Sequence, residues 1–394
     1  MKKVLMLGGA YSQIPMIEEA KKQGLYVVTC DYLPDNPGHK LADEYYNIST
    51  TDKVEVLNLA NKIKPDFIMA YASDPAAPVA AYVSEKLNLP TNTFKSIRTL
   101  SEKDYFREFL HQNGFNAPKS IGVEESDLSS DILNDFRLPI IIKPTDSSGS
   151  KGVVKVNYKD DFESATKYAL AFSRNKRIIL EEFIDTNGEQ LHGDGYVVDG
   201  KLVFCYLGDH HYNIRVNPFV PYSTTWPSKV DPYYLNRVED DVQKIISMIN
   251  FDNGPVNIEA RIFKEKVYIM EIGPRSGGNF VPQVLKWITN FDMVHAALAQ
   301  FLNQPIIVTE IEKGIGANYV IHSDKDGNLK SVLIDDILKK YIKELHIYIK
   351  EGDPVKSYQG SNAAIGILLL KFDSIITRDS IMKDIHNLVV VNVV

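Results

Sequence analysis

Short apolar runs alternate with amphipathic stretches along the first 90 or so residues. The apolar runs include VLMLG, YVVTCD and DFIMAY, and the stretches between them carry apolar residues at helical spacing. Gly24 and Pro65 follow two of these stretches, at positions where such residues end helices. Alternation of this kind predicts βαβ units and a parallel sheet.

The pattern changes at Ser101. The segment SEKDYFREFLHQNG predicts a helix capped by Ser101 and ended by Gly114. Short apolar runs with turn residues between them then predict an α+β arrangement with hairpins and a second, mainly antiparallel sheet. The predicted strands lie at 138–143, 152–157, 178–184, 191–198, 202–207, 254–263 and 266–273, and a helix is predicted at 161–173. The last 90 residues return to short strands and helices.

Composition narrows the class of protein. A chain of 394 residues with 44% hydrophobic and 24% charged residues predicts a soluble protein of about two or three domains. The net charge of −7 and the lack of a basic block disfavour nucleic acid as a partner. No run approaches the roughly 18 apolar residues of a membrane span. Cys30 and Cys205 stand in apolar runs, which favours buried thiols and a cytoplasmic location.

The first turn raises the question of a dinucleotide site. Gly8 and Gly9 follow the first apolar run, and Asp31 closes the second, as in a nicotinamide-binding unit. The fingerprint G-x-G-x-x-G fails, because counting from Gly8 requires glycine where Ala10 and Gln13 stand. We therefore interpret this segment as a βαβ unit with a tight turn, and a dinucleotide oxidoreductase is the least favoured alternative.

A loop of small residues follows the strand that ends at Lys143. The loop contains Ser147, Ser148, Gly149, Ser150, Lys151 and Gly152. Small residues let backbone N–H groups approach phosphate oxygens, and a lysine supplies the matching charge. The loop is not a P-loop, because it lacks G-x-x-x-x-G-K-[ST] and leads into a strand. Taken alone, a hairpin with a solvated lysine explains it better than a phosphate site.

Other titratable residues stand near the ends of apolar strands. Glu181 and Glu182 close one strand, and Glu189 follows shortly after. Adjacent side chains on a strand point to opposite faces, so only one of Glu181 and Glu182 can face a given cleft. The run 209–211, Asp-His-His, is interpreted as lying at the solvent or the rim of a pocket.

The strongest local signal is a pair of glutamates in a predicted hairpin. Glu259 and Glu271 stand at equal distances from a turn centred on Glu265, so we expect them to be cross-strand neighbours. Two like charges side by side in apolar strands are unfavourable unless a positive charge lies between them. Mg²⁺ takes one or two carboxylates together with phosphate oxygens, so the pair favours a metal site.

In their order and spacing, these motifs resemble those of the ATP-grasp superfamily, especially its carboxylate–amine ligases and its biotin-carboxylase and carbamoyl-phosphate-synthase-like branch. The resemblance rests on Lys103, Lys143 with its loop, EEFI, and Glu259 and Glu271 with EIGPRSGGN, and it covers essentially the whole chain. It implies an α/β and α+β fold. A Rossmann-like unit at 1–92 precedes an ATP-grasp domain with two α+β subdomains at 93–305, whose lid spans about 115–185. A small C-terminal α+β unit follows at 306–394.

The resemblance also implies roles for individual residues. The nucleotide-binding residues are Lys103, Lys143, Ser147, Ser148, Gly149, Ser150, Gly152, Glu181, Glu182, Phe183, Ile184 and, at the ribose, Glu189. Glu259 and Glu271 would hold Mg²⁺, with Mn²⁺ as an alternative ion. Arg275, with Lys143, would act at the transferred phosphoryl and acyl groups. The family often has Asn where this chain has Gly273, which leaves the third metal ligand open between Asn257, Asn279 and water.

The implied reaction is phosphoryl transfer from ATP to a carboxylate, followed by amide formation with an amine and release of ADP and phosphate. The implied partners are small-molecule acids and amines, with neither nucleic acid nor a membrane, and the resemblance admits a homodimer. GGAYSQ would then be a turn on the substrate side of the cleft. The alternatives are an ATP-grasp enzyme that activates bicarbonate or formate, and a protein that binds ATP without turnover.

Overall fold

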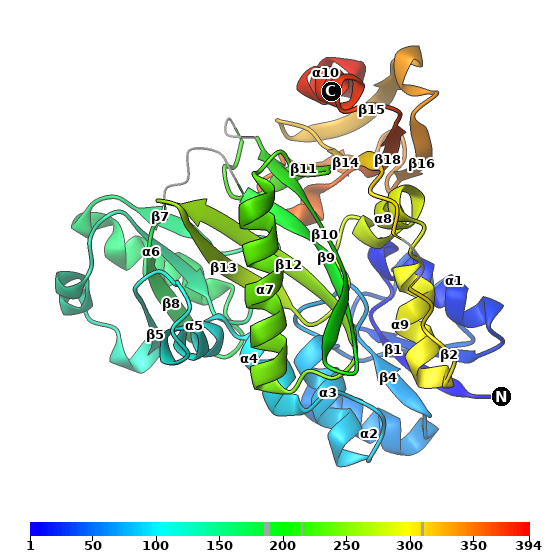
Figure 1. Cartoon of the computed structure of the whole chain (residues 1–394), viewed down its shortest axis with the longest axis horizontal. Helices are drawn as coiled ribbons and strands as arrows, with labels where there is room; N and C mark the ends of the chain where they lie inside the picture. Colours follow the sequence, from blue (N-terminus) through cyan, green and yellow to red (C-terminus); the bar gives the residue numbers. More distant parts are fainter. Residues whose placement is uncertain (185–189, 214–215, 309–310) are drawn as a thin grey trace.

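A four-stranded parallel sheet forms the N-terminal unit, drawn in blue in Figure 1. The computed structural model describes residues 1–184, 190–213, 216–308 and 311–394. The sheet has the order β3-β2-β1-β4. Its elements are β1 (Lys3–Leu7), α1 (Ile14–Lys22), β2 (Tyr26–Asp31), β3 (Glu44–Asn47), α2 (Lys53–Ile63), β4 (Phe67–Met69) and α3 (Ala77–Lys86).

The strands of this sheet are apolar throughout because both faces are covered. Leu5 and Leu7 of β1 pack with residues of α2 and α3. Val4 and Met6 point to the opposite face, where they pack with α1. Asp31 ends β2, and its carboxylate accepts hydrogen bonds from the Leu33 N–H and the Asn36 amide, so it holds the following turn.

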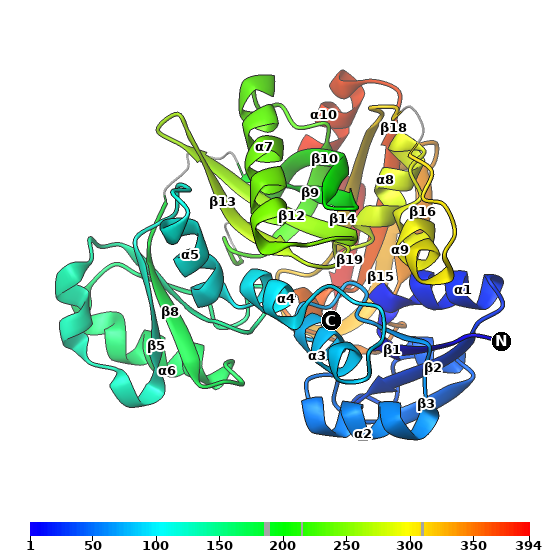
Figure 2. The same cartoon turned by 60° about the horizontal axis from the view of Figure 1, so that its bottom comes forward.

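A four-stranded antiparallel sheet with the order β5-β8-β6-β7 forms the next unit, which lies at the left of Figure 2. Two helices precede it, and one helix, α6, covers one face of the sheet. The elements are α4 (Phe94–Ser101), α5 (Lys103–Gln112), β5 (Ser120–Glu124), β6 (Ile140–Pro144), β7 (Val154–Val156), α6 (Phe162–Ala171) and β8 (Arg177–Glu182). The helix predicted from Ser101 therefore begins two residues later, because Ser101 is the last residue of α4.

The largest sheet has eight antiparallel strands in the order β13-β12-β9-β10-β11-β14-β18-β16. One face carries α7, which crosses the strands in Figure 1, and the other carries α8 and α9. The elements before residue 305 are β9 (Gln190–Val198), β10 (Lys201–Tyr212), β11 (Pro221–Trp226), α7 (Pro232–Ile249), β12 (Gly254–Phe263), β13 (Lys266–Gly273), α8 (Val281–Thr289) and α9 (Met293–Leu302).

The C-terminal residues complete this sheet and add a small one. β14 pairs with β11, and β18 and β16 continue the sheet beyond it. A separate sheet has the order β17-β15-β19. The elements are β14 (Ile315–Ile321), β15 (Gly327–Ile334), β16 (Ile342–Ile347), β17 (Pro354–Val355), β18 (Gly366–Phe372), α10 (Ile375–Lys383), α11 (Ile385–Leu388) and β19 (Val389–Val393).

The mixed α/β and α+β fold class predicted from the sequence is confirmed by these sheets. No helix among the described residues is long and apolar enough to cross a membrane.

Candidate active site

A cleft of about 700 Å³ lies between the sheet of β5 to β8 and the eight-stranded sheet. Except for Gly152, every site residue predicted from the sequence that the structure describes lines this cleft. Glu189 lies outside the described residues. The cleft also receives Ala10, Tyr11 and Ser12 from the first turn and Tyr348 from the C-terminal unit. Segments from the whole length of the chain therefore meet at one site.

Lys143 belongs to a buried cluster of charges. Its Nζ lies 2.6 Å from one Glu181 carboxylate oxygen, and the Arg107 Nε lies 2.7 Å from the other. Burial alone would raise the pKa of Glu181, but the charges of Arg107 and Lys143 lower it to about 2. Glu181 therefore stays ionised and fixes the ammonium group of Lys143 at the cleft wall.

Lys103 joins the small-residue loop to the glutamate hairpin. It is the first residue of α5, and its Nζ donates a hydrogen bond of 2.7 Å to the Ser147 carbonyl oxygen. The same Nζ lies 3.9 Å from a Glu271 carboxylate oxygen. Two lysines thus face one end of the cleft from different elements.

The small-residue loop bends through left-handed backbone conformations and contacts the opposite wall. Gly149, Ser150 and Gly152 have φ values of 66°, 59° and 75°. The Ser150 hydroxyl donates a 2.6 Å hydrogen bond to the Phe219 carbonyl oxygen, and Gly149 leaves no room for a side chain beside Ser361. The loop that follows β6 therefore reaches the opposite wall of the cleft at Phe219.

The segment after Glu181 forms another wall of the cleft. The Glu182 carboxylate accepts a hydrogen bond from the Arg137 N–H, which turns it away from Lys143. The Lys155 ammonium lies 3.9 Å from the centre of the Phe183 ring, and the Ile184 carbonyl oxygen accepts a hydrogen bond from Arg261. Glu181 and Glu182 have different partners, but both line the cleft, so the expectation that only one of them could face it is wrong.

Glu259 and Glu271 are cross-strand neighbours on β12 and β13, as predicted, and a bulge between Glu259 and Ala260 sets this register. Lys264 and Glu265 form the turn, with φ values of 49° and 59°. Burial and the charge of Glu271 raise the pKa of Glu259 from its ordinary value of 4.5 to about 7. The two carboxylates therefore repel each other in this structure, and a cation between them would offset this electrostatic repulsion.

Arg275 follows the hairpin and is held by an acid from the N-terminal unit. Its Nε and Nη2 donate hydrogen bonds of 2.6 and 2.7 Å to the two carboxylate oxygens of Asp74. Asp74 lies in the loop after β4, where the carboxyl end of a parallel strand commonly carries site residues. The bidentate pair fixes the plane of the guanidinium group.

Comparisons with known proteins agree with this geometry. Residues 136–283 match the family described as ATP-grasp domain. Residues 136–283 therefore form an ATP-grasp domain. It is 27% identical over 333 residues to a formate-dependent phosphoribosylglycinamide formyltransferase of Prochlorococcus marinus, with 82% of each chain covered.

Solved structures of other proteins superpose on the full chain. An L-amino acid ligase from Bacillus licheniformis has a TM-score of 0.84 at 19% identity, covering 100% of this chain and 99% of that one. The biotin carboxylase domain of Hydrogenobacter thermophilus 2-oxoglutarate carboxylase, crystallised as a dimer with MgADP, has a TM-score of 0.78 at 16% identity, covering 100% and 91%. The predicted fold is confirmed by these superpositions, and the predicted ATP-grasp domain by the family match over residues 136–283.

The residues of this ATP-grasp cleft fit Mg²⁺. Glu259 and Glu271 offer a pair of carboxylates. In the described part of the chain, no group of three or more histidine, cysteine, aspartate or glutamate residues is placed to hold a metal ion, so protein side chains of these types would supply only the pair. Mg²⁺ is usually held by one or two carboxylates, with water and phosphate oxygens completing its shell. The raised pKa of Glu259 is the observation that favours a cation there.

The presence of glycine at position 273, where the superfamily often has asparagine, has a steric reason. A Cβ at Gly273 would lie 2.9 Å from an Asp74 carboxylate oxygen and 3.2 Å from the Arg275 Cζ, so the ion pair occupies the space of a side chain. The Asn257 NH₂ group donates a hydrogen bond of 2.7 Å to Asp194, which leaves its side-chain carbonyl oxygen as a candidate ligand. Asn279 lines the cleft and keeps its place as a candidate ligand.

Several cleft residues were missed or misjudged from the sequence. His210 was predicted to lie at the solvent or a rim, but it is buried and stacks on His192 with ring centres 3.9 Å apart. Burial lowers the pKa of His192 to about 3, so the ring is neutral. The sequence around Asp74 and Arg107 did not indicate a role in the site. It indicated only that Asp74 follows a strand and that Arg107 lies in a helix. Alternation along β10 would have placed one of the two histidines inside.

The shifted glutamate predicts pH-dependent metal binding. Since Glu259 must lose its proton to bind a cation, Mg²⁺ affinity should fall by roughly tenfold between pH 8 and pH 6. Without metal, the raised pKa means that the folded state binds this proton more tightly, so this group stabilises the fold as pH falls from about 7 toward 4.5. Calorimetric titration with MgCl₂ at both pH values measures the change. Glu259→Gln should lose the pH dependence, and an unchanged affinity in the wild-type protein would contradict the assignment.

Proposed function

We propose that the chain is an ATP-dependent carboxylate–amine ligase that forms an amide bond through an acylphosphate. The observation that supports this most is the meeting of two lysines, two glutamates and Arg275 in one cleft. Such a cluster matches phosphoryl transfer, in which positioning and charge neutralisation do most of the work.

Lys103 and Lys143 bind the phosphates of ATP, and the loop of Ser147, Ser148, Gly149, Ser150 and Gly152 covers them. Lys143 is fixed by Glu181, so the Glu181 side chain acts by holding this lysine rather than by contacting adenine. Glu182, Phe183 and Ile184 lie along the adenine side. Glu189 is the proposed ribose ligand by resemblance.

Glu259 and Glu271 hold Mg²⁺, which supplies positive charge at the terminal phosphates when bound. Arg275 places a second cation near the transferred group, and Asp74 sets its orientation. Charge that develops between the phosphates and the acid is stabilised by these fixed groups without reorganisation during the reaction.

Two bond exchanges complete the proposed reaction. A carboxylate oxygen of the acid attacks the γ-phosphorus, the bond from that phosphorus to the β,γ-bridging oxygen breaks, and ADP leaves. The amine nitrogen then attacks the acyl carbon, loses a proton, and expels phosphate with the former carboxylate oxygen. Closure of the loop over the bound substrates excludes water, which would otherwise hydrolyse the acylphosphate, and the hydrogen bond from Ser150 to Phe219 supports this role.

Formate is a second candidate for the acid. Its support is the name of the Prochlorococcus relative, a formate-dependent formyltransferase. The reaction class is the same, because formate is also a carboxylate. A panel of amino acids, small acids and formate, tested for ATP-dependent phosphate release with added amines, separates the two.

Oxygen-18 tests the proposed bond changes. Acid labelled in its carboxylate should transfer one labelled oxygen to the released phosphate, which mass spectrometry detects. Label in AMP would show adenylation instead. Unlabelled phosphate would show ATP hydrolysis without acyl activation, and either result would refute the mechanism.

A further inference from the structure

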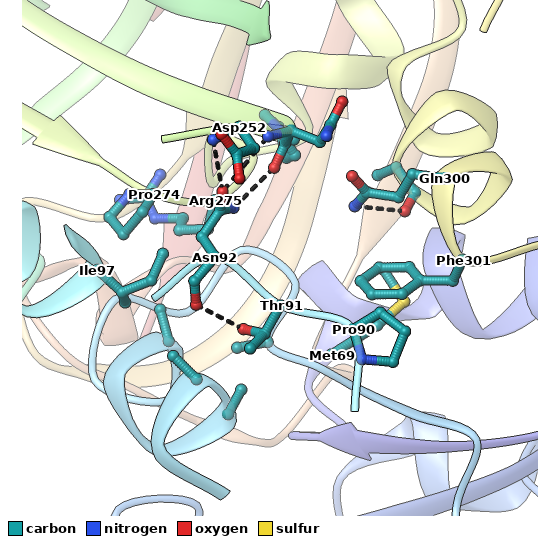
Figure 3. Close-up of a pocket in the computed structure, with 18 of the residues that line it drawn as sticks. Met69, Pro90, Thr91, Asn92, Ile97, Asp252, Pro274, Arg275, Gln300 and Phe301 are labelled. Carbon is teal, nitrogen blue, oxygen red and sulfur yellow. Dashed lines mark hydrogen bonds between the residues drawn. The ribbon is translucent and has the colours of Figure 1, made fainter. Parts of the chain in front are cut away.

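A second cavity of about 570 Å³ lies between the N-terminal unit and the eight-stranded sheet (Figure 3). Its walls come from β4, α3 and the segment after α3 on one side. The other walls come from the loop before β12, from the residues after β13 and from α9, which contributes Gln300 and Phe301 in Figure 3. Neither the resemblance nor the proposed reaction assigns it a ligand.

Small side chains create this space. Ala77, Ala80 and Ala81 lie on one face of α3 at the spacing i, i+3 and i+4, and Ala297 faces the cavity from α9. Met69 and Phe301 are among the larger apolar side chains around them. Cavities with mainly apolar walls and a few placed polar groups are typical of sites for small organic molecules.

The polar groups at the mouth are acidic or neutral. Asp199 and Asp252 are both exposed there, and the described contacts give neither carboxylate a hydrogen bond or an ion pair. The other polar residues that line the cavity mouth carry amides or hydroxyls. Among the described lining residues, Arg275 is the single cation, and Asp74 already neutralises it. The field at the mouth therefore attracts cations and repels anions.

Two buried hydroxyl groups in the cavity wall could form hydrogen bonds with a ligand. Tyr71 and Ser276 line the cavity and are 3% and 0% exposed. Their hydroxyls lie close to each other and to the Gln283 amide, yet none makes a hydrogen bond of regular geometry within the described chain. Buried polar groups of this kind are usually satisfied, so a small shift would let them bond to a ligand atom.

We propose that this cavity binds a small organic ammonium compound with an apolar body. The ammonium group lies between Asp199 and Asp252, and the body lies against the alanine face of α3 and Phe301. Arg275 lines both this cavity and the ATP cleft, so an occupant contacts the wall that holds a proposed reaction residue. The compound is either the amine substrate of the proposed ligase or a separate effector amine.

Direct binding tests the site without requiring turnover. The probe is 2-phenylethylammonium, compared with neutral 2-phenylethanol and anionic phenylacetate by calorimetric titration of the full chain. We expect the ammonium compound to bind at least about tenfold more tightly than either analogue, with an affinity that falls as NaCl is raised. Equal binding of phenylacetate would overturn the proposal.

Three variants locate the binding site. The double variant Asp199→Asn/Asp252→Asn should lower the affinity for the probe about fivefold or more. Asparagine also suits the φ of 48° at position 199. Thr91→Trp at the exposed rim should block entry. Asp240→Asn, an exposed acid on α7 outside the cavity, should leave binding unchanged. Unchanged binding in both the double variant and Thr91→Trp would overturn the proposal.

The two sources of the amine give different kinetics. If the occupant is the substrate, the double variant raises the KM for the amine. If it is an effector, that KM is unchanged and the probe alters the rate only in proteins that bind it. Stabilisation of every variant by MgATP against heat shows that the nucleotide site is intact, so failure of this proposal is distinguishable from failure of the proposed ligase reaction.

Discussion

Replacing Arg275 by glutamine should lower kcat by about 10²- to 10³-fold, the usual loss when a fixed donor to a developing charge is removed. ATP affinity should change by less than about threefold, because Lys103 and Lys143 remain at the phosphates. Steady-state kinetics with an active acid and amine, together with ATP titration, measure the two effects separately.

Two controls accompany Arg275→Gln. Arg237→Gln changes an exposed arginine on α7 and should leave kcat unchanged. Asp74→Asn keeps an oxygen that accepts a hydrogen bond from Arg275 but removes the negative charge. It should therefore lower kcat less than Arg275→Gln does. If Arg275→Gln weakened ATP binding and kcat in parallel, the arginine would belong to the nucleotide site instead.

Replacing Arg107 by methionine should lower the free energy of unfolding by about 3 to 5 kcal/mol, as breaking a buried ion pair from one side does. Arg107 is 1% exposed and Glu181 2% exposed, so the carboxylate would be left with Lys143 alone. Urea denaturation followed by fluorescence measures the change. Methionine retains most of the arginine volume, which limits the contribution of a cavity.

The double variant Arg107→Met/Glu181→Gln separates charge from packing. It should recover part of the lost stability, because it removes the unpaired buried charge. A double variant as unstable as the sum of its parts would mean that Arg107 acts through packing. Less than about 1 kcal/mol lost in the single variant would show that the ion pair is not stabilising.

Local patterns predicted the site residues that lie on single motifs. The glutamate hairpin is the clearest example, because equal spacing from Glu265 predicted that Glu259 and Glu271 are neighbours. In the structure a two-residue turn together with a bulge between Glu259 and Ala260 places them opposite each other. Lys143 and its loop followed from a strand end and small residues. Their placement in one cleft rested on the resemblance, since no local pattern reports which strands adjoin.

Partners from distant segments could not be predicted in this way. Asp74 and Arg275 are 201 positions apart, and their pairing exists because the loop after β4 packs against the end of β13. From the sequence, Arg107 is an ordinary helix residue. Its role follows only from the fold, in which β8 places Glu181 beside it. The same limit applies to the C-terminal strands, whose short apolar runs do not reveal which sheet they join.

The continuity of the eight-stranded sheet has a consequence for synthesis on the ribosome. β11 ends at Trp226, but its partner β14 is encoded about 90 residues later, and β18 and β16 complete the edge only near the end of translation. Until then the edge of β11 offers unpaired backbone groups to other chains. The nascent protein therefore has an aggregation-prone interval that ends when its last strands emerge, and a nonsense codon within the final 80 residues would make that interval permanent.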